Sequence, residues 1–506
     1  MNLLLSIPIV LPLLAAILCI LGRRNLARQR LISITAGALN LALATFLLVE
    51  IRSGGILALQ VGSWPAPYGI TLVADLFSAI MLIMSGLIGL VAAVYGLSMM
   101  DAEREKHQYH VFFNVLLMGV NGAFLTGDLF NLYVWFETML MASFVLLSLG
   151  GERPQLEGSI KYLAMNFLSS ALFLAGVGIL YGITGTLNMA DLALIIRGSE
   201  HSDIINAVSI MFLIAFGIKA AAFPLFFWLP ASYHTPPSPV SALFAGLLTK
   251  VGVYALIRMF TLVFMQDESF THRILLIMAG FTMVTGVLGA AAQMEFRRLL
   301  SFHIVSQIGY MIMGLGLFTA ATLAGSMLYI VHNIIAKTNL FLIAGAVAHK
   351  TGTNDLKRLG GLLNVYPGLA ILFLVAAMAL AGLPPLSGFF AKLSLVLPGF
   401  AQGQFLIIGV AMGVGLLTLF SMTKIWNEVF WKPRPESGQG AAPDLQPWTT
   451  RERWTLLAPI VLLAAGSAAL GLFAGPVYDL FLEAGEQLKS GAAYIEAVNP
   501  VVGRDH

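Results

Sequence analysis

The sequence predicts an all-α polytopic membrane protein with about fourteen transmembrane helices. Hydrophobic residues make up 58% of the 506 residues and charged residues only 10%, which is less than half the share typical of soluble chains. Apolar stretches long enough to cross about 30 Å of hydrocarbon follow one another with short loops between them. Basic residues gather in alternate loops, as the positive-inside rule describes.

Each predicted transmembrane segment is a run of mainly apolar residues bounded by polar or turn-forming residues. The segments are residues 3–21, 31–50, 72–99, 111–126, 129–149, 160–183, 205–229, 240–263, 274–292, 299–318, 323–348, 368–397, 405–430 and 454–473. The residues from Lys432 to Arg453 are expected to form a flexible loop.

The odd-numbered loops between these segments carry most of the positive charge. Their basic residues are Arg23, Arg24, Arg28, Arg30, Arg104, Lys106, Arg153, Arg297, Arg298, Lys350, Lys357, Arg358, Lys432, Arg434, Arg451 and Arg453. The even-numbered loops carry few basic residues, namely Arg52, Arg197 and Arg273. We therefore expect a multi-pass membrane protein whose odd loops face the cytoplasm and whose termini both lie outside.

Two of the segments are interrupted by proline. Pro224 lies inside segment seven, and Pro384 and Pro385 lie inside segment twelve. Proline removes a backbone donor, and irregular backbone at membrane depth is tolerated only where protein or a wet cavity surrounds it. Broken helices in corresponding positions of two halves are typical of transporters built from inverted repeats, although two ordinary proline kinks remain an alternative.

The five-segment separation of the two breaks predicts the domain organisation. We expect helices 1–3 in residues 1–110, a first inverted five-helix repeat (helices 4–8) in 111–263 and a second (helices 9–13) in 264–431. The cytoplasmic loop, helix 14 and an external tail then occupy residues 432–506.

A few charged residues lie well inside apolar segments: Glu137, Lys219, Lys250, Lys337 and Lys392. A charge at the centre of a bilayer costs at least about 2.5–3.5 kcal/mol, so such residues usually serve transport. We predict a proton or ion path along them. Glu137 is expected to pair with Lys219, with Lys161 as a second candidate, and a static ion pair between helices is the alternative.

Segment eleven contributes His332 and Lys337, which face different sides of a helix, whereas Asn333 and Lys337 share a face. A neutral imidazole accepts and donates protons, so His332 is a candidate relay; a buried histidine with satisfied hydrogen bonds is an equally weighted alternative.

Other polar residues have simpler expected roles. Lys424 and Glu428 have the i, i+4 spacing of an ion pair on a helix surface. Arg258 is expected to anchor its segment near the outer interface. We expect Asp75 and Asp128 to be solvated at segment ends. His234 is a candidate for the lining of a cytoplasmic entrance, and His303 for the polar file.

No motif for a cofactor, a metal or a nucleic acid is evident. The sequence has no Walker motif, no HExxH and no CxxCH, and Cys19 is the only cysteine. No basic cluster with interleaved aromatic residues suggests nucleic acid binding. The chain is therefore expected to be a secondary transporter subunit and not an enzyme, driven by an ion gradient or by a partner subunit.

Several stretches resemble a known family. KAAAFPLFFWLPASYHTPPSPVSALFAGLLTKVGVYALIR, LSFHIVSQIGYMIMGLG and LAGLPPLSGFF resemble signatures of the antiporter-like membrane subunits that respiratory complex I and Mrp antiporters share. Two features are similar to the D-type subunits of Mrp Na+/H+ antiporters. They are the stretch VGSWPAPYGITLVADLFSAIM and the short length of the chain.

The resemblance implies a function. It places the family's proton path on Glu137, Lys219, Lys250, His332, Lys337 and Lys392. It implies a hetero-oligomer with other Mrp subunits, notably A and C, in the lipid of a bacterial inner membrane. This hetero-oligomer would exchange protons for Na+. The alternatives are a proton-pumping subunit of a complex I-type quinone oxidoreductase or hydrogenase, and a purely structural scaffold.

Overall fold

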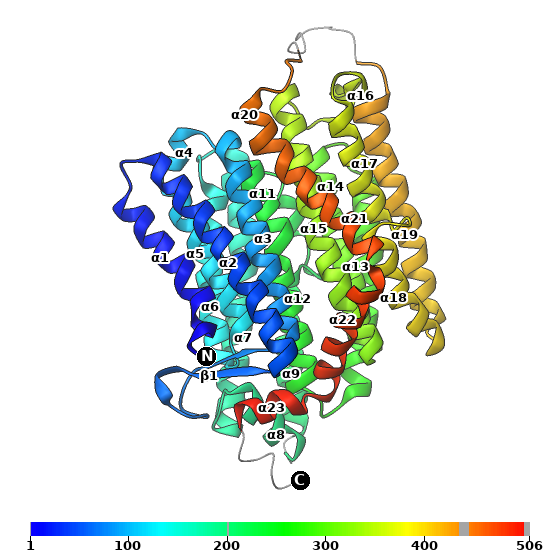
Figure 1. The fold of residues 1–506 in the computed structure, drawn as a ribbon. Helices are drawn as coiled ribbons and strands as arrows, with labels where there is room; N and C mark the ends of the chain where they lie inside the picture. The colour runs from blue at the N-terminus through cyan, green and yellow to red at the C-terminus, as the bar shows by residue number, and fades with distance from the viewer. Residues whose placement is uncertain (1, 200–201, 435–444, 500–506) are drawn as a thin grey trace.

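The computed structural model describes residues 2–199, 202–434 and 445–499, which fold into a long bundle of roughly parallel helices (Figure 1). The N-terminal part forms one edge of the bundle. Its elements are η1 (Asn2–Ser6), α1 (Ile7–Leu21), α2 (Leu26–Gly54), β1 (Leu57–Gln60), η2 (Val61–Ser63), β2 (Thr71–Ala74), α3 (Leu76–Met99) and α4 (Ala102–Lys106).

The next group of helices contains the first break. Its elements are α5 (Tyr109–Leu125), α6 (Leu129–Ser148), α7 (Arg153–Thr184), α8 (Met189–Arg197), α9 (Ser202–Ala220), α10 (Trp228–Ser232), α11 (Ser238–Leu243), η3 (Phe244–Leu248), α12 (Thr249–Arg258) and η4 (Met259–Val263). The last four form one continuous rod with two π-helical turns.

The third group contains the second break, and the chain ends in helices that cross the bundle. The third group consists of α13 (Glu268–Ala291), α14 (Phe296–Leu317), α15 (Ala320–Thr351), η5 (Leu356–Arg358), α16 (Leu362–Val365), α17 (Pro367–Ala381), α18 (Ser387–Ala401), α19 (Phe405–Ile425) and η6 (Trp426–Trp431). The final elements are α20 (Thr450–Glu452), η7 (Arg453–Leu457), α21 (Ala458–Leu472), α22 (Ala474–Ser490) and α23 (Ala492–Val498).

Twelve helices within the described residues are long and apolar enough to span a membrane. The helix α5 is apolar but shorter, and α17 and α18 are two short apolar helices on either side of the second break. These elements are compatible with about fourteen crossings, although that number stays a prediction. The most apolar stretch of α15 is completely buried inside the chain, whereas that of α2 is only one-third buried. The bundle therefore packs around α15, and α2 lies at its edge (Figure 1).

Two helices of equal length reveal an internal repeat. The helix α15 begins and ends 167 residues after α7 does, at 320 against 153 and at 351 against 184. An isolated backbone bridge joins Asp128 to Asn188 in the first unit, and its counterpart 167 residues further on joins Glu295 to Asp355. The helix α8, after the first bridge, and α16, after the second, lie at opposite ends of the bundle (Figure 1). The two units therefore run in opposite directions.

One part of the helix prediction is wrong. The apolar residues from Leu72 to Ala74 begin no helix but form β2, which pairs antiparallel with β1. Asp75 then caps α3 in a capping box with Ser78. An apolar run of three residues is ambiguous in sequence, and pairing with β1 satisfies its backbone here. Apart from this hairpin, the described residues are mostly helical.

The C-terminal helices close one end of the bundle. The helix α22 packs against α15, and α23 contacts α8 and β1. Strand β1 also contacts η1, so the two ends of the described chain lie near the same hairpin. Of the predicted loop from Lys432 to Arg453, residues 435–444 lie outside the described residues.

Candidate functional site

The first break ends α9 at Ala220, one residue after Lys219. Ala221 has a φ of 60°, in the left-handed region, and turns the chain away from the helix axis. The carbonyl of Ile218 accepts hydrogen bonds from the amide of Ala221 at 3.0 Å and from the indole nitrogen of Trp228 at 3.1 Å. The amide of Phe223 donates to Thr282 Oγ1 on α13 at 3.0 Å. The irregular backbone is thus satisfied by backbone and side-chain groups inside the bundle, as membrane burial requires.

Glu137 and Lys219 come together, but through a third residue. Ser170 on α7 donates to Glu137 Oε1, and its Oγ accepts from Lys219 Nζ at 3.2 Å. Lys219 is buried, and Glu137 is half-buried on α6. The second predicted partner is excluded, because Lys161 Nζ lies on the surface, 2.5 Å from Glu157.

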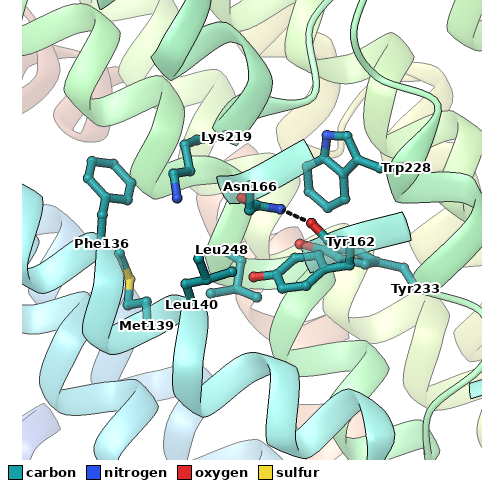
Figure 2. A pocket seen from close by; sticks show the side chains of 9 residues that line it. All are labelled: Phe136, Met139, Leu140, Tyr162, Asn166, Lys219, Trp228, Tyr233 and Leu248. Atoms are coloured by element: carbon teal, nitrogen blue, oxygen red, sulfur yellow. Dashed lines mark hydrogen bonds between the residues drawn. The ribbon is translucent and has the colours of Figure 1, made fainter. Parts of the chain in front are cut away.

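Lys219 also lines a small cavity. About 20 Å³ of it is open to the centre of a water molecule, which is enough for one water. Figure 2 shows Lys219 entering it between Phe136 and Asn166. The ring of Phe136 lies 5.3 Å from Lys219 Nζ, a cation–π distance. The complete lining is Phe136, Met139, Leu140, Tyr162, Asn166, Lys219, Trp228, Tyr233 and Leu248.

Lys250 follows the π-helical turn η3 and is completely buried. Its Nζ donates to the carbonyl of Ala245 at 2.6 Å. A side chain at Gly252 would collide with the backbone of Lys219 and Ala220, so this glycine lets α12 pass directly beside the first break. The rod and the broken helix therefore hold Lys250 close to the end of α9.

Lys337 and His332 lie on α15 and are also completely buried. Lys337 Nζ donates to the carbonyl of Leu300 at 3.3 Å. His332 Nδ1 lies 2.8 Å from Ser387 Oγ, which in turn lies 2.8 Å from Ser467 Oγ. The imidazole is thus connected to α18 and α21 by a chain of hydroxyl groups.

The second break places Lys392 on α18, facing the end of α17. Lys392 Nζ donates to the carbonyl of Ala381 at 2.6 Å and lies 5.3 Å from the ring of Tyr310. Gly382 follows with a φ of 93°. This lysine donates to a main-chain carbonyl at its break, as Trp228 does at the first.

Several buried polar atoms near these lysines have no hydrogen-bond partner in the described part of the chain. Buried polar groups normally need a hydrogen-bond partner, and a water molecule can serve as one for these atoms. They are Thr249 Oγ1, both ring nitrogens of His303, Ser306 Oγ, Gln307 Nε2, His332 Nε2, both polar atoms of the Asn333 side chain and Thr338 Oγ1. Their helices α12, α14 and α15 run between the two breaks.

Some expectations about the outlying charges are wrong. Asp75 is buried, and Arg258 pairs with it at 2.7 Å. Lys424 donates to the carbonyls of Ala291 and Gln293, while Glu428 pairs with Lys432, so the predicted Lys424–Glu428 pair is not formed. In each case a partner other than the expected one satisfies the charge.

Two further residues lie near helix ends. Asp128 caps α6 by accepting from the amide of Asn131 at 2.7 Å, so it is more than a solvated residue. His234 lies between α10 and α11, and Arg297 donates to its carbonyl. Burial and the nearby Arg297 and Arg298 lower the pKa of the His234 imidazole to about 4.

Comparison with known proteins identifies the family. Residues 126–418, more than half of the chain, match the family model described as NADH:quinone oxidoreductase/Mrp antiporter, transmembrane. The chain belongs to this antiporter family. A relative from Alkalihalophilus pseudofirmus, which is named as the D-type subunit of a Na(+)/H(+) antiporter, is 47% identical over 98% of this chain and 99% of its own. A relative of the same name from Bacillus subtilis is 40% identical, with the same coverage.

Solved structures of this antiporter family share the fold. A chain in the structure of the Mrp complex from a Dietzia species superposes with a TM-score of 0.90 at 33% identity, covering 98% of this chain and 99% of that one. A chain of respiratory complex I from Thermus thermophilus has a TM-score of 0.80 at 24% identity, covering 96% and 99%. The second likeness concerns the fold alone.

Ser170 is the site residue that sequence reasoning missed. It is one of many serines in apolar segments, and its partners lie on two other helices. The 167-residue repeat, which the structure reveals, pairs Ser170 with Lys337.

Proposed function

We propose that this chain is the D-type membrane subunit of a multi-subunit Na+/H+ antiporter and that it carries the protons. The path runs from Glu137 and Lys219 through Lys250 and then Lys337 or His332 to Lys392. The division of the chain into two inverted units, residues 111–263 and 264–431, belongs to this proposal and is supported by the 167-residue repeat.

The observation that carries the proposal is the kind of hydrogen-bond partner that each buried lysine amine has. Lys250, Lys337 and Lys392 each donate to a main-chain carbonyl, and Lys219 donates to a hydroxyl. A carbonyl accepts a hydrogen bond from an ammonium and from a neutral amine alike. A buried ion pair, in contrast, would stabilise the charged, protonated form of the lysine. These four lysines are therefore free to gain and lose a proton in place.

Orientation and setting complete the proposal. The basic loops face the cytoplasm, both termini lie outside, and the protein resides in a bacterial cell membrane with other Mrp subunits. The chain acts as a transporter subunit and not as an enzyme. The redox-driven alternative has weaker support, because the relatives of highest identity reported above are named antiporter subunits.

Replacing Glu137 or Lys219 by alanine tests the proposal. Each variant of the intact complex should assemble but lose Na+-dependent proton exchange. Normal exchange in both variants would overturn the proposed path.

A further inference from the structure

Ser170 is the one described residue that hydrogen-bonds to both Glu137 and Lys219. Its hydroxyl donates to Glu137 Oε1, and its oxygen accepts from Lys219 Nζ at 3.2 Å. Ser170 is 5% exposed. Its helix α7 packs against both α6, which carries Glu137, and α9, which carries Lys219. The carboxylate and the amine thus communicate through this hydroxyl.

Among the described residues around Glu137 and Lys219, no second polar side chain connects the two. The rings of Phe136, Phe173 and Phe216 pack together with centroids 4.9–6.0 Å apart. Phe136 also lies against Lys219. This aromatic wall leaves Ser170 as the polar link between Glu137 and Lys219.

The neighbouring serine on α7 makes a separate contact. Ser169 Oγ donates to the carbonyl of Ala215 on α9 at 2.7 Å. This bond joins α7 to α9 and involves neither Glu137 nor Lys219. Ser169 is therefore a structural residue, and it is a natural control for Ser170.

Hydroxyl chemistry suits a proton relay. An ammonium only donates and a carboxylate only accepts, whereas a serine hydroxyl does both. In one step, a Lys219 N–H bond breaks and its proton bonds to Ser170 Oγ, while the original Ser170 proton moves to a Glu137 oxygen. The ammonium becomes an amine, the carboxylate becomes a carboxylic acid, and the serine is neutral before and after.

The internal repeat makes this arrangement specific to the first unit. At the equivalent of Ser170 the second unit has Lys337, 167 residues further on, and at the equivalent of Glu137 it has Ile304. The second unit thus has an amine in place of the hydroxyl and an apolar side chain in place of the carboxylate. The carboxylate–hydroxyl–amine arrangement occurs where the first broken helix ends.

We propose that Ser170 is a proton-relay residue that passes protons between Lys219 and Glu137. The proposal rests on the proposed function, since it assigns a role within the same path. It predicts that the hydroxyl group, and not the shape of the side chain, is required for transport.

The test compares Ser170→Thr with Ser170→Val in the complete antiporter complex. Threonine and valine have nearly the same shape, and only threonine keeps the hydroxyl. Na+-dependent proton exchange should persist in S170T and fall by about 100-fold in S170V, the size of a typical proton-transfer contribution. Ser169→Ala should retain exchange, because Ser169 makes only a structural bond. Amounts of assembled complex are measured for each variant.

Equal exchange in S170T and S170V, whether both are active or both inactive, would overturn the relay. Failure of the relay alone is recognised when Glu137→Ala and Lys219→Ala are inactive while S170V is active. If those two variants are also active, the proposed function itself fails.

Discussion

Asp75 and Arg258 form a buried ion pair that joins the start of α3 to the end of α12, with Nη2 and Oδ2 2.7 Å apart. Asp75 also accepts from the amide of Ser78 at 2.9 Å. The Arg258 guanidinium lies 5.0 Å from the ring of Tyr494 on α23. The pair therefore ties three separate parts of the chain together at the end of the bundle near the hairpin.

Removing one partner of this pair should destabilise the protein. Asp75→Asn leaves the Arg258 charge buried without a counter-charge, which typically costs about 3–5 kcal/mol. We expect a lower Tm of the purified complex and less assembled complex in membranes. The double variant Asp75→Asn, Arg258→Met should recover most of the loss, because no buried charge remains unpaired. A double variant as unstable as Asp75→Asn would contradict this explanation.

Charge-conserving substitutions of the path lysines should abolish transport. Arginine keeps the positive charge but does not release its proton at physiological pH, so Lys250→Arg and Lys392→Arg should assemble without exchanging protons. Lys424→Arg is the matched control, since Lys424 lies in the last turn of α19, outside the proposed path. Transport by all three variants would show that these lysines act as fixed charges.

Substitution of His332 decides between its two roles. If the imidazole relays protons, His332→Ala should slow exchange by about 100-fold. Ser387→Ala removes only its 2.8 Å hydrogen-bond partner and should have a smaller effect. Initial rates of Na+-dependent proton exchange measure both. A His332→Ala variant with normal rates would assign the relay to Lys337.

His234 should affect stability at low pH rather than the pH dependence of transport. Its pKa of about 4 keeps it neutral above about pH 5 in the folded chain, whereas an unfolded histidine takes up a proton below about pH 6.5. Protonation therefore favours unfolding as the pH falls from about 6.5 towards 4. His234→Asn should raise the Tm of the complex at about pH 5 relative to the native protein, by more than at about pH 8. An equal difference at both pH values would contradict this linkage.

The candidate path lysines and Glu137 were evident in the sequence because isolated charges in apolar segments are conspicuous, and their role in the path stays a proposal. Pro224, Pro384 and Pro385 likewise indicated both breaks, since proline disrupts a helix wherever it lies in the interior. Hydropathy does not show which side chains meet across helices. The Ser170 bridge, the Asp75–Arg258 pair and the carbonyl partners of Lys424 therefore emerged only from the structure.

Local ambiguity explains the remaining difference. The residues from Leu72 to Ala74 have the apolar character of a helix start and of a strand alike, and the pairing with Leu57–Gln60 decides between them. The inverted repeat was expected from topology. Its 167-residue offset became visible once the bounds of α7 and α15 were known.

The most direct test is the change in ΔpH on adding Na+ to inverted membrane vesicles that contain the complete antiporter complex, with and without Glu137→Ala. We expect a Na+-induced change with the native chain and none with the variant at equal amounts of assembled complex. An equal response from both would contradict a proton path through Glu137. No Na+ response from the native chain, with proton pumping on adding a redox substrate, would contradict the antiporter function itself.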